Sequence, residues 1–161
     1  MQVATYAQMP GATLERVGQH IGRHRGAPLD ATELRALDER LETVRRWLPD
    51  WAPERIRFSV ALEGLPEAAA QLTEQQRRYL ETLADTVAGT VEWDGETLQS
   101  VIFEHARSRQ LAPGKAFNAI YLAFVGKPSG PRAGALWASL DPQFVTDRLK
   151  VAAGAGEPAA T

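Results

Sequence analysis

Apolar side chains recur at helical spacing along most of the chain. The clearest series consists of Leu34, Leu37, Leu41, Val44 and Leu48. Positions three and four apart share one face of a helix, so such a series forms an apolar stripe that packs against a neighbour. Residues 55–62 alternate in the manner of a strand. Because a single strand has no partner, we expect an extended link there, and the whole pattern predicts an all-α fold.

Capping residues predict where several helices begin. Asp30 with Glu33, and Thr73 with Gln76, have the spacing of capping boxes, in which two side chains bond the free backbone N–H groups of the first turn. Other helix starts are predicted at residues that can cap a helix, namely Thr13, either Asp94 or Thr97, and Asp141. Pro113 and Pro142 mark starts as well, because the missing N–H of proline costs little in the first turn.

Two prolines predict the main internal break. Pro49 and Pro53 flank Trp51, and proline both lacks an N–H and restricts the residue before it. We therefore expect the helix that begins near Asp30 to end before this segment. The resulting division is an N-terminal helical segment with a hairpin (1–52), a linker (53–66), a C-terminal bundle of about five helices (67–151) and a disordered tail (152–161).

The stretch 117–140 carries the most specific pattern. Four large side chains share one helical face: Phe117, Ile120, Tyr121 and Phe124. Gly126 ends this helix, and a second apolar period begins at Leu136. The link between them is restricted by prolines, takes tight turns at glycines, and has Lys127 near its start and Arg132 near its end. Such a loop is suited to binding a phosphate-bearing partner.

Composition and charge narrow the classes of function. The 161 residues include no cysteine, which excludes disulfides, thiolate zinc sites and cysteine nucleophiles. No apolar run approaches the roughly 20 residues of a membrane span and no signal pattern opens the chain, so we expect a cytoplasmic protein without a membrane partner. Up to Glu104 there are 11 basic and 17 acidic residues, whereas from His105 onward there are 7 and 3. This asymmetry favours a polyanion surface in the C-terminal half.

The order of segments resembles the C-terminal, anticodon-binding region of class I lysyl-tRNA synthetases, which is related to that of glutamyl-tRNA synthetases. The likeness spans about 110 of the 161 residues. It is carried by Arg46–Trp47 with Ala52–Glu54, by Leu72–Gln76, by Trp93–Gln99, and by a final signature made of Phe117–Leu122, Gly126–Lys127, Gly130–Arg132, Phe144–Val145 and Arg148–Leu149.

This resemblance implies a helical bundle of the α-helix-cage type that binds the anticodon stem-loop of a lysine tRNA. The loop residues that it assigns to the anticodon are Lys127, Ser129, Gly130, Pro131 and Arg132. Arg148 matches a closing arginine, and two roles stay open for it: an RNA contact or a structural bond within the bundle. Trp137, the tryptophan nearest the loop, is a candidate for stacking on a base, although core anchoring is an alternative.

The family's catalytic domain has no counterpart in this sequence. The segment His20–His24 imitates a catalytic H-I-G-H motif, but its neighbours have helical period and no strand pattern precedes it. His20 and His24 also lack a third ligand for a metal. We therefore expect no catalytic residue, metal or cofactor here, with ATP and magnesium bound elsewhere in a parent lysine-tRNA ligase. Such a chain would be inactive alone.

Two other functional classes stay open. If the chain is a fragment, its partners are lysine tRNA and the catalytic domain of a parent synthetase. It could instead be a free-standing, non-catalytic tRNA-binding or regulatory paralogue, or a helical module that binds proteins.

Overall fold

The computed structural model describes residues 2–54 and 57–154. Within these ranges every regular element is helical, which confirms the predicted all-α class. The chain divides into two compact units, Met1–Ser59 and Val60–Thr161. We call them unit 1 and unit 2 and describe each by itself. The division falls inside the predicted linker 53–66.

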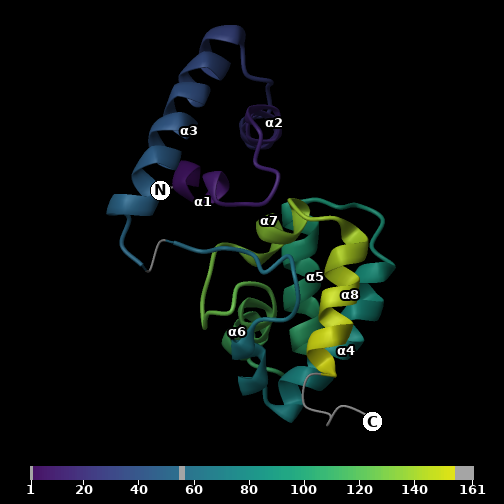
Figure 1. Ribbon diagram of the computed structural model, residues 1–161. Coiled ribbons are helices and arrows are strands. Elements are labelled where there is room, and N and C mark those ends of the chain that lie inside the picture. The colour runs from purple at the N-terminus through teal and green to yellow at the C-terminus, as the bar shows by residue number, and fades with distance from the viewer. Residues whose placement is uncertain (1, 55–56, 155–161) are drawn as a thin grey trace. The chain divides into compact units, whose positions relative to one another are not determined.

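Unit 1 contains three helices, α1 (Gln2–Ala7), α2 (Leu14–Arg25) and α3 (Ala31–Trp51), the last being the long helix of Figure 1. Both α1 and α2 pack against α3. Val17, Leu37 and Leu41 are buried at the centre, and partly buried apolar side chains from α1, α2 and the turns on either side of α2 surround them. The predicted leucine stripe thus faces the core of this unit.

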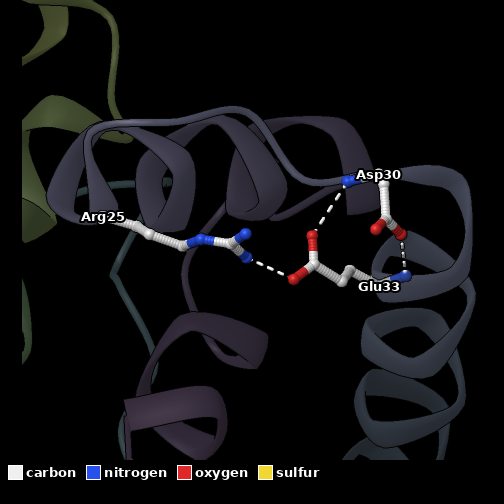
Figure 2. Close-up of polar contacts among 3 residues, drawn as sticks. All are labelled: Arg25, Asp30 and Glu33. Carbon is white, nitrogen blue, oxygen red and sulfur yellow. Dashed lines mark hydrogen bonds and ion pairs between the residues drawn. The ribbon is translucent and has the colours of Figure 1, made fainter.

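The turn between α2 and α3 is fixed by polar contacts (Figure 2). The Asp30 side chain accepts from the Glu33 N–H at 2.8 Å, and the Glu33 side chain accepts from the Asp30 N–H at 2.9 Å, which confirms the predicted capping box. Arg25, at the end of α2, donates to the same Glu33 carboxylate. The Asp30 N–H and Arg25 together lower the pKa of Glu33.

The end of α3 corrects one prediction. The helix continues through Pro49 and ends at Trp51, with Ala52 as its C-cap. Proline costs a helix most in its interior, where it removes an N–H bond and crowds the preceding turn. Pro49 lies in the final turn of α3, so only that turn is affected. The Pro49 carbonyl, at the helix end, accepts from the Arg57 guanidinium at 3.3 Å. Arg55 and Ile56 of the predicted extended link lie outside the described residues.

Unit 2 contains a short 3-10 helix, η1 (Glu67–Gln71), and the predicted bundle of five α-helices. These are α4 (Glu74–Ala88), α5 (Gly95–Ser108), α6 (Pro113–Phe124), α7 (Ala133–Ala138) and α8 (Pro142–Ala153). In Figure 1, α4 and α8 run side by side, and the two helices share extensive contacts. Helix α7 packs on α5, and α6 contacts η1, α4, α5, α7 and α8. The largest side chains in the resulting core are Trp137, Tyr79 and Phe124.

The predicted helix starts of unit 2 are confirmed. Thr73 and Gln76 form a capping box at α4, and Asp141 caps α8. Of the two candidates for the start of α5, Asp94 is the cap. Pro113 occupies the first position of α6. Local sequence therefore determines where these helices begin.

The C-terminal end of unit 2 differs in part from the predicted tail. Ala152 and Ala153 belong to α8, and Ala152 is fully buried, so helix continues where a disordered tail was predicted to begin. Residues 155–161 of that tail lie outside the described residues. No helix among the described residues has the length and apolar character to span a membrane.

Candidate nucleic-acid interface

Residues 125–132, which connect α6 to α7, form the loop to which the sequence assigned binding; we call them the basic loop. Its first turn is closed by the Tyr121 carbonyl, which accepts from the N–H of Val125 at 2.8 Å and of Gly126 at 2.9 Å. Gly126 has φ +71°, a left-handed conformation that glycine adopts without strain. A Cβ at Gly126 would also lie 3.0 Å from the Pro66 side chain. The loop therefore leaves α6 in one defined direction.

Side chains of α4 and α6 hold the middle of the basic loop. The Asn118 amide donates to the Pro128 carbonyl at 3.0 Å, and the Tyr121 hydroxyl donates to the Pro131 carbonyl at 2.7 Å. Gln76, which is 5% exposed, donates in turn to the Asn118 side chain at 3.1 Å. We call Gln76, Asn118 and Tyr121 the loop latch. Because Gln76 also closes the capping box of α4, the loop is connected to the start of that helix.

Gly130 lies directly against the ring of Tyr121. A Cβ at this position would be 2.9 Å from the Tyr121 Cδ1 atom, which is closer than side-chain carbons approach each other. Burial raises the pKa of Tyr121, so its hydroxyl stays protonated and able to donate to Pro131 at neutral pH. Gly130 thus determines the shape of the loop.

The end of the basic loop is anchored through the start of α7. Arg132 is the N-cap of α7, and the Gly134 N–H donates to the Gln99 side chain of α5 at 2.8 Å. A Cβ at Gly134 would approach the Gly95 carbonyl oxygen to 2.2 Å. Only glycine at this position lets α7 lie so close to the start of α5. The exit of the loop is therefore as well fixed as its entry.

The predicted loop residues differ in exposure. Ser129, Gly130 and Arg132 are exposed, whereas Lys127 and Pro131 are half-buried. Among the described residues, the Arg132 guanidinium has no ion-pair partner, while Lys127 makes an interaction within the chain. Of the two predicted cations, Arg132 is thus the more available to a ligand.

Trp137 requires a correction. It was predicted as a candidate for base stacking, but its side chain has no exposed surface. It packs in the core of unit 2 with its ring 5.6 Å from that of Phe124. Its indole N–H is buried without a hydrogen-bond partner among the described atoms. The alternative of core anchoring therefore applies to Trp137.

Arg148 takes the structural role that the sequence left open. The side chain is 6% exposed, its Nη1 donates to the Ala123 carbonyl at 3.2 Å, and its guanidinium lies over the Phe144 ring at 5.0 Å. Burial lowers the pKa of Arg148. An arginine used in this way joins α8 to α6 and presents no cation to solvent.

Sequence reasoning missed the role of the loop latch. Gln76 was noticed for its capping box, which uses only its side-chain oxygen and leaves its amide nitrogen to bind Asn118. No spacing rule connects residues 42 positions apart. One local signal was present: asparagine is a poor helix former, and Asn118 lies in the middle of α6.

His20 and His105 make contacts within the fold. The segment that imitates a catalytic motif lies within α2, where His20 contacts the Tyr6 hydroxyl. Among the described residues, no group of three histidine, cysteine or acidic side chains could hold a metal. His105 is bound by the hydroxyls of Thr82 and Thr86 on α4.

Comparison with known proteins adds an independent finding. Residues 13–153 match the family described as "Anticodon binding domain". The chain is 43% identical over 105 residues to a lysine–tRNA ligase of Methanopyrus kandleri, covering 65% of this chain and 18% of that protein. It is 29% identical over 151 residues to the lysine–tRNA ligase of Pyrococcus horikoshii and 30% identical over 152 residues to that of Methanococcus maripaludis. These alignments cover 92% and 93% of this chain, but each covers only 28% of the relative.

Proposed function

The chain belongs to the anticodon-binding domain family, and from this membership we propose that its basic loop binds the anticodon of a lysine tRNA. The predicted resemblance to the anticodon-binding region of lysyl-tRNA synthetases is confirmed by the family match and by these relatives. The assignment of particular loop residues to RNA is a proposal that we argue from their geometry.

The main support is that the basic loop is held rigidly while its outer residues face solvent. The loop latch and Gly134 fix it at three points, and Ser129, Gly130 and Arg132 stay exposed. Proteins read RNA sequence mainly at single-stranded loops, where unstacked bases offer their edges to hydrogen-bonding groups. A preformed loop loses little conformational entropy when it binds such bases. The exposed backbone at Gly130 and the exposed guanidinium of Arg132 are groups that can form such hydrogen bonds with bases.

The choice of lysine tRNA and the link to aminoacylation are supported by the relatives. Each is a lysine–tRNA ligase, and the chain spans less than a third of each one's length. We propose that anticodon binding here orients the tRNA acceptor end toward a catalytic region elsewhere in such an enzyme. In that arrangement, binding energy at a remote site contributes to the reaction. We propose that ATP and magnesium bind in that catalytic region. Their binding and the cytoplasmic location both stay predictions.

Replacement of Arg132 tests this proposal. Arg132→Ala should raise the Kd for lysine tRNA by roughly 10- to 150-fold, because a charge-assisted hydrogen bond contributes roughly 1.5–3 kcal/mol. If the guanidinium contacts a phosphate, the slope of log Kd against log salt should also fall by about 1. Arg46→Ala is a matched control, because Arg46 is an arginine of unit 1 with 84% of its side chain exposed. An Arg132→Ala variant that binds as tightly as the parent chain, with unchanged circular dichroism, would exclude the basic loop as the site.

A further inference from the structure

Three aromatic rings of unit 2 contact one another in a continuous row, and only one of them, Tyr121, belongs to the loop latch. Phe103 comes from α5, and Phe117 and Tyr121 come from α6. The Phe103 and Phe117 centroids are 4.9 Å apart with the rings edge to face, and the Phe117 and Tyr121 centroids are 6.4 Å apart with the rings nearly parallel. We call these three residues the aromatic row.

The aromatic row is continuous with the basic loop. Tyr121 forms one end of the row, where Gly130 lies against its ring and the Pro131 carbonyl accepts from its hydroxyl. The row runs from there through Phe117 to Phe103 on the neighbouring helix. The row and the basic loop are therefore joined at Tyr121.

Phe103, at the outer end of the row, is more exposed to solvent than the large rings of the unit 2 core. Phe103 is 45% exposed and is the one aromatic residue among the exposed large apolar side chains described in this unit. By contrast, Trp137 is fully buried, and the Trp93 indole N–H is used by the carbonyls of Trp137 and Leu140. The core of unit 2 does not depend on Phe103, since Leu98, Ile102 and Ala106 form the buried face of α5.

The surroundings of the row favour a nucleic-acid ligand. Arg107 is exposed and lies one helical turn beyond Phe103 on α5, and Arg132 is exposed at the opposite end of the basic loop. Exposed rings flanked by cations are the combination by which proteins hold single-stranded nucleic acid, because every base has a face that can stack while its phosphates are neutralised nearby.

We propose that the aromatic row is a stacking platform for an unpaired base of the anticodon loop, with Phe103 as its principal contact. This inference rests on the proposed function and extends it. The platform would supply affinity that is tolerant of sequence, because stacking does not distinguish bases through hydrogen bonds. The basic loop would supply the choice of anticodon.

The test uses the full chain and an anticodon stem-loop RNA of lysine tRNA, with 2-aminopurine placed at each loop position in turn. Phe103→Leu keeps an apolar side chain and removes the ring, so the Kd should rise roughly five- to hundredfold, the range that corresponds to loss of one stacked base. The slope of log Kd against log salt should not change, because no charge is removed. Phe103→Tyr should restore the affinity to within about twofold. Val151→Ala, another exposed apolar residue of unit 2, is the control and should bind like the parent chain.

The fluorescence readout locates the stacked base. At one loop position, 2-aminopurine fluorescence should change when the parent chain binds, and Phe103→Leu should abolish that change. If the parent chain binds and Arg132→Ala weakens binding, but Phe103→Leu matches the parent chain at every position, the stacking platform is wrong and the proposed function stands. Unchanged RNA binding by Phe103→Leu is also what we would expect if the aromatic row bound a protein partner instead. No binding by the parent chain would overturn both proposals.

Discussion

Burial separates the side chains that can meet a ligand from those that hold the fold. Trp137, Arg148 and Arg132 lie within 17 positions of one another in the sequence, and all three were candidates for RNA contact. The first two are buried within unit 2, whereas Arg132 is exposed. A residue type that suits RNA is therefore informative only together with the direction in which its helix points it.

The buried position of Trp137 leads to a prediction about stability and binding. Trp137→Ala should lower the free energy of unfolding by about 3–5 kcal/mol, because a large core side chain is removed and leaves a cavity. Trp137→Phe keeps most of the packing and removes the buried N–H that has no partner, so it should fold and bind tRNA like the parent chain. Denaturant unfolding and tRNA titration of both variants provide the check. If Trp137→Phe folds normally but loses tRNA affinity, the Trp137 indole takes part in RNA binding and the account of a purely structural role is wrong.

At the scale of elements, the loop latch turns a flexible connection into a defined surface. Two helices contribute to it: α4 through the side chain that caps its own first turn, and α6 through Asn118 and Tyr121. The basic loop is consequently held at the carbonyls of Pro128 and Pro131. We infer that its rigidity, as well as its charge, contributes to binding.

Removal of one hydroxyl tests the latch. Tyr121→Phe deletes the bond to the Pro131 carbonyl and keeps the ring, so stability should fall by only about 0.5–1.5 kcal/mol while tRNA affinity also falls. Tyr79→Phe is a matched control, because the Tyr79 hydroxyl donates to the Ile102 carbonyl at 3.0 Å away from the loop. The control should lose comparable stability and keep its affinity. Equal affinities for the two variants, measured by tRNA titration and thermal unfolding, would show that the latch does not position the RNA site.

Sequence predicted the local features of these elements better than their contacts. Capping signals at Asp30, Thr73 and Asp94 act within one turn, and the structure confirms all three. The prediction that the helix ends before Pro49 was wrong, because the cost of a proline depends on its place in the helix and here only the last turn is affected. The bond from Gln76 to Asn118 depends on how α4 and α6 pack, and no local rule encodes that packing.

At the scale of the molecule, the family match includes residues from both units. Residues 13–153 carry it, from α2 in unit 1 to α8 in unit 2. The net charge of −2 conceals a balance of −6 up to Glu104 and +4 beyond it, where the basic loop lies. Long-range attraction of tRNA would therefore come from a local patch, and salt should weaken it strongly.

The central claim is that this chain distinguishes the anticodon of lysine tRNA, and one titration tests it most directly. The purified chain is titrated with lysine tRNA and with the same tRNA carrying a replaced anticodon, each at several salt concentrations. We expect tighter binding to the natural anticodon, by about 1–3 kcal/mol for each recognised base that is replaced, with both affinities falling as salt rises. Equal affinity for the two tRNAs, or no salt-dependent binding at all, would contradict the claim.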